Sequence, residues 1–546
     1  MNSRRTSAFL RAISAALALW CSATALAQFQ TCVDVNAPIN TSTGATSQQI
    51  QPSTIAGLAT NRVRINCIIA PWSSPSDSTL HSGRTWFQAY DQIVNDFIAQ
   101  GTAVYMLIGG QAVNSGFGLN TSQYADQYAA NFETIVGHFK DRVQVFETFN
   151  EPNDWAGGSS AQVEPRYFAY MLQEIYMNVK YRDAHVSDPT WQVTIVSGPM
   201  FTHDISGDGD LGNTYFTSTA NAGKNGDAAI PSLDWNNVKT LTGSYPYDGI
   251  GYHIYARQGS TDAADISARL DLHLDSMMSA VDTIEGTSAH GKKFWISEIG
   301  WGSNHVTPDG QAANLDTALN LFRSDARVQM ATWFCLADFD PGNQYGLHTD
   351  NALLVSQRKP AWWHLRRQSL VADATTTLAR NPGFESAAQY WTSFGTSDGV
   401  QSGSWFGGIT ARTGSSFWGA AANFGVKNGG VYQQYFTTAG QTITAATWVR
   451  TYREGGSFGN TTGRIGIDPA GGTNPDAGSV VWSDLLESPG AWHPVVARTT
   501  ATGAMATVFL RHVQSAPTWN VTAFDDVTVL GATSAVPVQV TAVSAD

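Results

Sequence analysis

Short runs of β-branched and aromatic residues alternate with longer stretches of helical periodicity between Thr31 and about Ala372. Repeated strand-and-helix units are typical of α/β folds built on a parallel sheet. The runs with the length and composition of buried strands are Cys32–Ala37, Arg62–Ile69, Ala103–Ile108, Val143–Phe149, Gln192–Ser197, Gly249–Tyr255, Lys293–Ser297 and Gln329–Leu336. Eight strands in about 340 residues predict a (β/α)₈ TIM barrel.

The pattern changes beyond the barrel segment, which we place at residues 28–372. Residues 373–377 have the composition of a linker, and residues 378–530 are rich in Gly, Thr and Ser with short alternating strands. This alternation predicts an all-β sandwich. Residues 531–546 have no aromatic residue and no clear partner, which favours a tail.

The first 27 residues have the pattern of a signal peptide. Three arginines precede the apolar stretch Ala12–Trp20, and small residues at Ala25–Ala27 suit cleavage before Gln28. A membrane anchor is the alternative, but neither this stretch nor any later segment approaches the roughly 20 apolar residues of a membrane span. We therefore expect a secreted protein, extracellular or periplasmic.

The composition favours a globular protein without nucleic-acid partners. Hydrophobic residues make up 42% of the chain and charged residues 14%, which supplies a core and argues against disorder. The formal charge of −13 would become −16 on loss of the leader's three arginines. Nucleic acid is not an expected partner of so acidic a chain. The sequence leaves the oligomeric state open.

The cysteines are too few and too scattered for a zinc site. Cys21 lies in the leader, which leaves Cys32, Cys67 and Cys335. In an oxidising compartment one pair can form a disulfide. Because Cys32 and Cys67 lie on neighbouring predicted strands, we expect them to be bridged and Cys335 to be free and buried.

Two glutamates stand where predicted strands end. The run Val143–Phe149 leads directly into Asn150-Glu151-Pro152, and Lys293–Ser297 leads into Glu298. The carboxyl ends of barrel strands carry the active site in TIM barrels. A pair of carboxyl groups at this position is typical of a glycosidase active site, and such an enzyme needs no cofactor for catalysis.

These motifs resemble glycoside hydrolase clan A, especially the cellulase-like enzymes of families five and thirty-nine. In that clan Asn-Glu ends strand four and the nucleophile ends strand seven in a Thr-Glu-x-Gly-Trp context, where this chain has Ser297. The resemblance implies Glu151 as acid/base and Glu298 as nucleophile. The residues it implies for substrate binding are Arg64, Asn150, His253, Tyr255, Trp301 and Trp333. We expect Trp333 to stack on sugar.

The chemistry of double displacement explains these residue types. Glu298 must be ionised to attack the anomeric carbon, which Arg64 would favour, and Glu151 must hold a proton for the leaving group. Glu147 has the same strand parity as Glu151 but lies about 13 Å deeper at about 3.3 Å per residue. We interpret Glu147 as a buried structural acid.

The expected function is hydrolysis of O-glycosidic bonds in a polysaccharide or oligosaccharide with retention of configuration. Two alternatives stay open: a non-catalytic glycan-binding or adhesion protein on a barrel scaffold, and a transglycosylase that uses the same glutamate pair. Loops set specificity in this fold, so the glycan, its linkage and endo or exo action cannot be derived.

The C-terminal segment resembles jelly-roll carbohydrate-binding modules in its motifs Asn381-Pro-Gly-Phe384-Glu385 and Phe524-Asp525-Asp526-Val527. The resemblance implies a structural calcium ion at Glu385 and Asp526. Trp405 and Trp418 have Gly/Ser-rich surroundings, so we expect them, with neighbouring Phe406, to stack on sugar. The alternative is a sandwich that only supports the barrel.

One further acidic segment, His203–Asp210, contains part of a calcium-loop pattern. Tyr215 stands where an EF-hand needs its bidentate glutamate. We therefore expect a solvated rim loop there.

Overall fold

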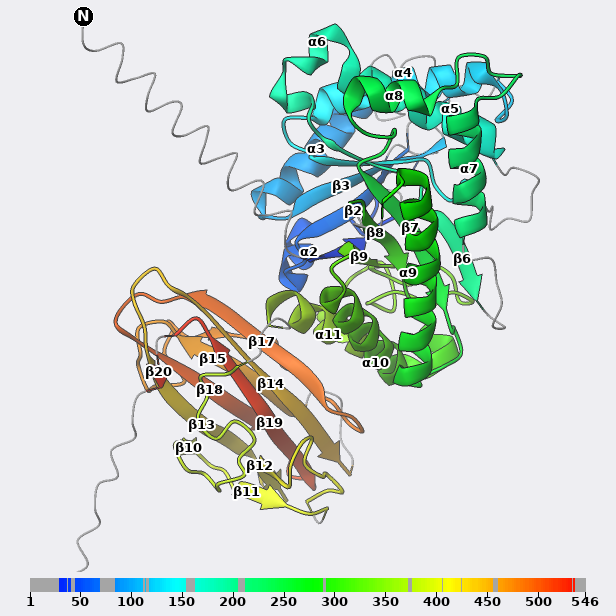
Figure 1. Cartoon of the computed structure of the whole chain (residues 1–546). Helices are drawn as coiled ribbons and strands as arrows, with labels where there is room; N and C mark the ends of the chain where they lie inside the picture. The colour runs from blue at the N-terminus through cyan, green and yellow to red at the C-terminus, as the bar shows by residue number, and fades with distance from the viewer. Residues whose placement is uncertain are drawn as a thin grey trace, which may run out of the picture. The chain divides into compact units, whose positions relative to one another are not determined.

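The computed structural model describes two compact parts of the chain, divided between Trp362 and Trp363. The first contains a parallel barrel and the second contains antiparallel sheets (Figure 1). The predicted leader, residues 1–27, lies outside the described residues, and the predicted domain limits stay predictions. The residues described are 29–36, 38–40, 45–68, 84–110, 113, 117–153, 163–204, 212–287, 291–371, 376–404, 406–423, 425–454, 460–532 and 534–535.

The barrel is a closed parallel sheet, as predicted. Its strands are β1 (Gln30–Asp34), β2 (Arg62–Cys67), β3 (Ala103–Ile108), β4 (Val145–Thr148), β5 (Thr194–Val196), β6 (Met200–Asp204), β7 (Gly249–Ala256), β8 (Lys293–Ile299) and β9 (Val328–Trp333). They follow the order β5-β4-β3-β2-β1-β9-β8-β7-β6, and the pairing of β5 with β7 closes the ring.

The fifth barrel strand is split into β5 and β6, which the sequence did not predict. Ser197, Gly198 and Pro199 separate the two pieces. A Cβ atom on Gly198 would lie 2.4 Å from the backbone oxygen of Thr148, and Pro199 has no amide hydrogen to donate to a ladder. β5 pairs with β4 and β6 pairs with β7, so together they fill one of the eight barrel positions.

One packed layer of side chains fills the barrel. Its members come from six different strands and are Cys32, Tyr105, Val145, Val196, Trp295 and Met330. Side chains alternate across a strand with a period of two, so Asp34 and Glu147, two residues further along, also face the interior. The interior is therefore apolar in this layer and polar nearer the carboxyl ends of the strands.

Helices surround the strands of the barrel (Figure 1). They are α2 (Pro52–Leu58), α3 (Trp86–Ala99), α4 (Ser122–Phe139), α5 (Pro165–Tyr176), α6 (Asp183–Val186), α7 (Asn213–Asn225), α8 (Trp235–Thr242), α9 (Ala263–Glu285) and α10 (Ser303–Ser324). A further helix, α11 (Pro360–Leu370), contains the division between the two parts of the chain. Shorter turns are η2 (Met177–Tyr181), η3 (Pro189–Trp191) and η4 (Val355–Gln357). Among the residues described, no helix has the length and apolarity needed to cross a membrane.

Local sequence fixes where these helices begin and end. Thr85 and Gln88 form a capping box at the start of α3, which satisfies backbone N–H groups that lack a partner within the helix. α9 starts after Asp262, whose side chain accepts from two backbone amides, and ends at Gly286 with φ +72°. Glycine adopts this left-handed conformation without steric cost.

The second part of the chain is an antiparallel sandwich, as predicted. One sheet has the order β10-β13-β18-β15-β16, with β20 on β13, and the other has the order β11-β12-β19-β14-β17. The strands are β10 (Thr392–Gly395), β11 (Gly399–Ser402), β12 (Ser416–Ala422), β13 (Lys427–Phe436), β14 (Thr442–Arg453), β15 (Thr461–Asp468), β16 (Val481–Trp482), β17 (His493–Thr500), β18 (Met505–Gln514), β19 (Asn520–Leu530) and β20 (Ser534–Ala535). β20 gives the predicted tail a partner, β13.

The predicted disulfide is wrong. Cys32, Cys67 and Cys335 are all free and buried. Cys32 pairs in register with Arg62 at the start of β2, whereas Cys67 ends that strand five residues later. At about 3.3 Å per residue the two cysteines are roughly 16 Å apart along the strand, far beyond the reach of a disulfide.

Candidate active site

A cavity of about 330 Å³ opens where the barrel strands end at their carboxyl side. It is lined by Asn36, Asn150, Glu151, Phe201, Tyr255, Glu298, Phe334, Phe339, Asn343 and Tyr345. Two larger hollows, of about 770 and 680 Å³, lie over helices α9 and α10 on the outside of the barrel. Of these three hollows among the described residues, the strand-end cavity is the one that contains both predicted catalytic glutamates, so it is the candidate active site.

Glu298 faces the cavity because β8 contains a bulge. Tyr252 pairs with Ile296 but the next residue, His253, pairs with Glu298, so Ser297 is an extra residue on β8. A bulge of this kind changes which side chains face the interior. The Glu298 carboxylate then accepts from Arg64 Nη1 at 2.8 Å and from the Tyr255 hydroxyl at 2.6 Å.

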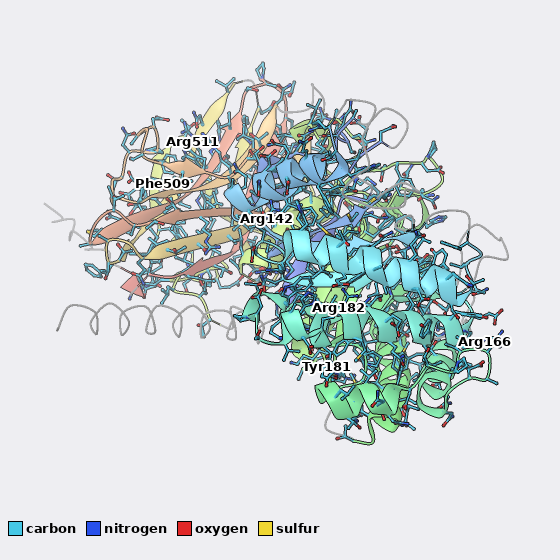
Figure 2. The ribbon with its side chains drawn as sticks, turned by 90° about the horizontal axis from the view of Figure 1, so that it is seen from above. Arg142, Arg166, Tyr181, Arg182, Phe509 and Arg511 are labelled. Atoms are coloured by element: carbon cyan, nitrogen blue, oxygen red, sulfur yellow. The ribbon has the colours of Figure 1, made fainter. Side chains whose placement is uncertain are left out.

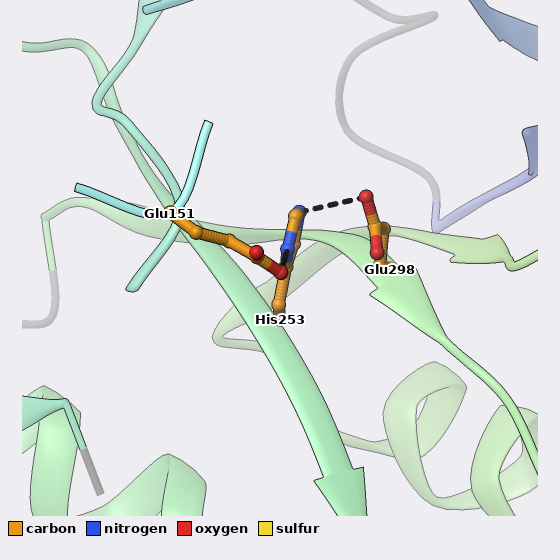
Figure 3. Close-up of side chains that lie close together, drawn as sticks. All are labelled: Glu151, His253 and Glu298. Atoms are coloured by element: carbon orange, nitrogen blue, oxygen red, sulfur yellow. Dashed lines mark hydrogen bonds and ion pairs between the residues drawn. The ribbon is translucent and has the colours of Figure 1, made fainter. Parts of the chain in front are cut away.

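Glu151 approaches Glu298 from the opposite side of His253. The backbone turns sharply after β4, with φ +58° at Phe149 and +46° at Glu151. Glu151 Oε1 lies 2.8 Å from His253 Nδ1. One ligand atom from each of Glu151, His253 and Glu298 lies within 4.8 Å of the other two, with the imidazole between the carboxyl groups (Figure 3).

Arg64 on β2 connects the buried acids beneath the cavity. Its Nη1 contacts Asp34 at 2.7 Å as well as Glu298, and its Nε contacts Glu147 at 2.9 Å. Its Nη2 donates to Asn150 Oδ1 at 3.2 Å. Asp34, Arg64 and Glu147 are each no more than 2% exposed. Because water cannot reach the two carboxylates, the guanidinium of Arg64 is the main compensation for the negative charge of Asp34 and Glu147.

Burial and neighbouring charges set the proton affinities of the site. Burial raises the pKa of Glu298, Arg64 lowers it, and Glu151 and Asp34 raise it further. Burial lowers the pKa of His253 to about 4, so the imidazole is neutral at pH 7. Burial and the charge of Glu298 raise the pKa of Tyr255 well above its usual value, so its hydroxyl stays a donor.

The structure brings together six of the residues predicted for the barrel site: Glu151, Glu298, Arg64, Asn150, His253 and Tyr255. Glu147 is fully buried, as expected, but it is not remote. Because the chain turns at Phe149, the extended spacing behind the 13 Å estimate does not apply. Glu147 and Asn150 both contact the Arg64 side chain.

The predictions for Trp301 and Trp333 are wrong. Both are almost fully buried, and neither lines the cavity. Their rings lie 6.3 Å apart, and the Trp333 indole donates to the Tyr345 carbonyl. Met330 faces the barrel interior, so Trp333, three residues further on, faces outward by strand alternation, and Phe334 faces the cavity in its place.

Several cavity residues were not predicted: Asn36, Phe201, Phe334, Phe339, Asn343 and Tyr345. Asp34 was missed as well. A single charged residue within the apolar run Cys32-Val33-Asp34-Val35 is a signal that could have indicated it, because a buried charge needs a partner. The residues in loops carry no comparable pattern.

In the sandwich, the predicted stacking role of Trp418 is wrong. Trp418 is fully buried on β12, with its ring 5.7 Å from His512 and 5.8 Å from Phe524. Phe406 is also buried. Trp405 lies outside the described residues. Trp418 therefore packs between the two sheets, because His512 belongs to one sheet and Phe524 to the other.

The carboxylates predicted to bind calcium have protein donors. Glu385 accepts from the backbone amides of Ser415 and Ser416, and Asp526 forms an ion pair with Arg412 at 2.6 Å. Arg412 thus supplies a positive charge where a calcium ion would be needed, which does not favour the ion. The calcium site stays a prediction.

Within the part of the chain that the structure describes, the one cluster of three potential metal ligands is Glu151, His253 and Glu298. Arg64 already places a positive charge at 2.8 Å from Glu298, so the cluster suits paired-carboxylate chemistry without an added cation. Of the predicted rim loop His203–Asp210, residues 205–210 lie outside the described residues.

No protein-family model matches this chain, and no curated protein matches it. A structure search found a family 39 glycoside hydrolase from the gut symbiont Bacteroides cellulosilyticus WH2, at 14% identity over 89% of this chain and 81% of that chain, with a TM-score of 0.42. It also found a broad-specificity endoglucanase of family GH5-4 from Clostridium acetobutylicum, at 16% identity over 62% and 96%, with a TM-score of 0.39. A carbohydrate-binding module, TmCBM61 in complex with β-1,4-galactotriose, aligns at 13% identity over 29% and 99%, with a TM-score of 0.23.

Proposed function

We propose that this protein is a secreted, retaining glycoside hydrolase that cleaves O-glycosidic bonds in a polysaccharide. The observation that carries the proposal is the pair of strand-end glutamates, Glu151 and Glu298, whose nearest ligand atoms lie within 4.8 Å. Carboxyl groups about 5–5.5 Å apart belong to retaining enzymes, whereas inverting enzymes need about 6.5–9.5 Å for a water molecule.

The contacts of Glu298 suit a nucleophile. Arg64 and Tyr255 donate to different oxygens of its carboxylate, at 2.8 and 2.6 Å. Two charge-assisted hydrogen bonds hold the carboxylate in place and stabilise its ionised form against the effect of burial. Attack on the anomeric carbon then forms a covalent glycosyl ester at Glu298 and breaks the bond to the leaving oxygen.

The contacts of Glu151 suit the acid and base. It donates a proton to the leaving oxygen in the first step, and its carboxylate then takes a proton from the water that hydrolyses the ester. Esterification removes the negative charge of Glu298, which makes Glu151 more acidic for this second role. His253 Nδ1 lies 2.8 Å from Glu151 Oε1 and orients its carboxyl group.

The cavity walls suit a sugar. Aromatic rings of Phe201, Phe334, Phe339 and Tyr345 supply apolar faces, and side-chain amides of Asn36, Asn150 and Asn343 supply donors and acceptors for hydroxyl groups. Apart from the two glutamates, the described lining carries no charge. We therefore expect the sugar bound beside the glutamates to be uncharged.

The test is the configuration of the first product. The purified enzyme would be screened on β-linked glucan, xylan, mannan and arabinose-containing polysaccharides, and fresh product from the best substrate followed by NMR. Retention of configuration is expected, and Glu298→Ala should lower turnover by orders of magnitude. Initial inversion, or near-normal turnover of folded Glu298→Ala, would contradict the proposal.

The same assay separates the alternatives. Product transferred to an added acceptor sugar in preference to water would identify a transglycosylase, since both reactions share the glycosyl ester. Binding of glycan with no turnover on any substrate would favour a non-catalytic protein. Secretion is tested by the N-terminus of protein recovered outside the cytoplasm, which should lie near Gln28.

A further inference from the structure

The outer face of one sandwich sheet carries a group of aromatic and cationic side chains that the catalytic proposal does not use. In this sheet, Val431, Ile465, Val508 and Leu510 are fully buried on the inner face. Alternation places the intervening residues of β13, β15 and β18 on the opposite face. That face carries Tyr432, Arg464, Phe509 and Arg511, and Phe394 and Trp482 contact it from β10 and β16.

Phe509 is the centre of an aromatic layer on this face. Its ring lies 5.8 Å from Phe394, 5.6 Å from Tyr432 and 6.0 Å from Trp482. Gly466, paired with Phe509 on β15, leaves room for the indole, because a Cβ atom there would lie 2.4 Å from Trp482. Phe509 is fully buried, whereas the three rings around it are half-buried.

Two arginines lie directly opposite one another beside this layer. Arg464 on β15 pairs in register with Arg511 on β18, and both guanidinium groups lie over the Trp482 ring, at 4.2 and 5.8 Å. Figure 2 labels Arg511 together with Phe509, two residues away on the same strand. Like charges directly opposite on neighbouring strands are destabilising.

The protein compensates this pair only in part. Arg511 forms an ion pair with Asp476 at 2.7 Å and donates to Asn428 at 2.9 Å, but the Asp476 side chain is 70% exposed. Arg464 Nε is buried without a hydrogen-bond partner. Burial and the neighbouring charge of Arg511 lower the pKa of Arg464, and the charge of Asp476 raises it, so one carboxylate serves two arginines. The face therefore has an excess of positive charge in a chain whose formal charge is −13.

We propose that this face binds an acidic saccharide, with a sugar carboxylate at Arg464 and Arg511 and a sugar ring against the aromatic layer. Guanidinium groups bind carboxylates through paired hydrogen bonds, and aromatic side chains pack against the apolar faces of sugars. A carboxylate there would place a negative charge beside both guanidinium groups and offset the repulsion between the arginines. The site lies within the sandwich and does not depend on the activity of the barrel.

The proposal differs from the sequence expectation in its driving force. The sequence favours binding by aromatic residues near Trp405 and Trp418, which would tolerate high salt. An arginine pair predicts that affinity falls as salt screens charge, since the Debye length shrinks from about 10 Å at 0.1 M to about 3 Å at 1 M. The salt dependence therefore distinguishes the two.

The experiment is calorimetric titration of the full chain with tetramers of galacturonate, mannuronate and glucuronate. Each tetramer is compared with the same oligomer after chemical reduction of its carboxyl groups. At least one acidic tetramer should bind, and its reduced form should bind at least about tenfold more weakly. This comparison uses the wild-type protein, so it does not depend on how any variant folds. Equal affinity for both forms, or no binding up to about 1 mM of any acidic tetramer, would overturn the proposal.

Variants locate the binding. Arg464→Gln with Arg511→Gln should weaken the acidic tetramer at least about tenfold, while Arg498→Gln, an exposed arginine on β17 of the other sheet, should leave it unchanged. Arg464→Gln alone should not lower the melting temperature, because it removes a like-charge neighbour. Undiminished binding by the folded double variant would overturn the proposal, and so would dextran sulfate binding more tightly than every uronate tetramer.

Discussion

Asp34→Asn is the substitution that most directly tests how the site controls the charge of Glu298. Asp34 was not predicted from the sequence, yet its Oδ2 contacts the same nitrogen, Nη1 of Arg64, that contacts Glu298. Its Oδ1 accepts from the backbone amide of Asn36 at 2.5 Å. Burial raises the pKa of Asp34, whereas Arg64 and the backbone amide of Asn36 lower it and favour the carboxylate.

The expected magnitude follows from the geometry. The two carboxylate oxygens contact Nη1 at 2.7 and 2.8 Å, so they can be no further apart than the sum, 5.5 Å. At an effective dielectric constant of about 20, two unit charges at that separation repel by about 3 kcal/mol, which corresponds to about 2 pH units. Arg64 lies between them, so we expect a shift of about 1 to 2 pH units.

The direction of the pKa shift depends on which protonation state of Glu298 the charge of Asp34 destabilises. The charge of Asp34 destabilises ionised Glu298 and raises the pKa of Glu298. Without that charge, Glu298 ionises at lower pH. If Glu298 is the nucleophile, the acid limb of the kcat/KM profile moves to lower pH in Asp34→Asn.

The assay is the pH profile of kcat/KM on the best substrate found, measured beside a melting curve. In Asp34→Asn the side-chain NH₂ group replaces one of the two oxygens that accept from Arg64 and from the Asn36 amide. One of these donors then loses its acceptor, so a stability loss of about 1–3 kcal/mol is expected as well. Asp91→Asn is the matched control, because it removes the same charge from a partly exposed site on α3. An acid limb that stays in place, or moves to higher pH, in a folded Asp34→Asn would refute this account of Arg64 and Glu298.

Three further predictions concern single groups. Tyr255→Phe removes the 2.6 Å hydrogen bond to Glu298, so kcat/KM should fall by roughly 10- to 100-fold and stability by about 1–3 kcal/mol. A loss of kcat/KM below about threefold in the folded variant would contradict a role in holding the nucleophile. The three described cysteines should be unreactive to a thiol reagent in the native protein and all react after denaturation; an oxidised pair in a mass map would contradict this. Burial lowers the pKa values of His253, His348 and His512 to about 4, so below about pH 6.5 these groups take up protons when the protein unfolds. The free energy of unfolding, measured by chemical denaturation, should therefore fall between about pH 6.5 and pH 4. Stability that rises over this range would contradict the burial of these histidines as neutral groups.

The main features of the barrel could be predicted because buried parallel strands are nearly continuous apolar runs. That pattern located all eight barrel positions and indicated that Glu151 and Glu298 end two of them. It missed β6 (Met200–Asp204), because Ser197, Gly198 and Pro199 interrupt the apolar run and end the predicted strand at Ser197.

The same continuity explains the error at Trp333. When both faces of a strand are buried, the sequence does not indicate which alternate residues face inward. On β9, Met330 and Trp333 are both buried and apolar, yet the first packs inside the barrel and the second packs outside. The bulge at Ser297 has the same consequence on β8, where parity alone would place Ser297 inside in place of Glu298.

The error at Trp418 has a different cause. Glycine and serine around an aromatic residue are typical of loops, but they also occur where small residues let a large ring lie close to a backbone. Trp418 is followed by Gly419, whose added Cβ atom would lie 2.8 Å from the Phe406 ring. Small residues here serve close packing, which local sequence cannot distinguish from exposure.

The position of His253 shows why its burial matters to Glu151. His253 contacts Arg64 Nη2 through Nε2 at 3.5 Å, and arginine can only donate, so Nε2 is the acceptor and Nδ1 carries the hydrogen. Nδ1 then donates to Glu151 Oε1 at 2.8 Å. A protonated imidazole at that distance would hold Glu151 as a carboxylate and prevent it from giving a proton to the leaving oxygen. Because burial lowers the pKa of His253 to about 4, the imidazole stays neutral above that pH, and it orients Glu151 without taking over its charge.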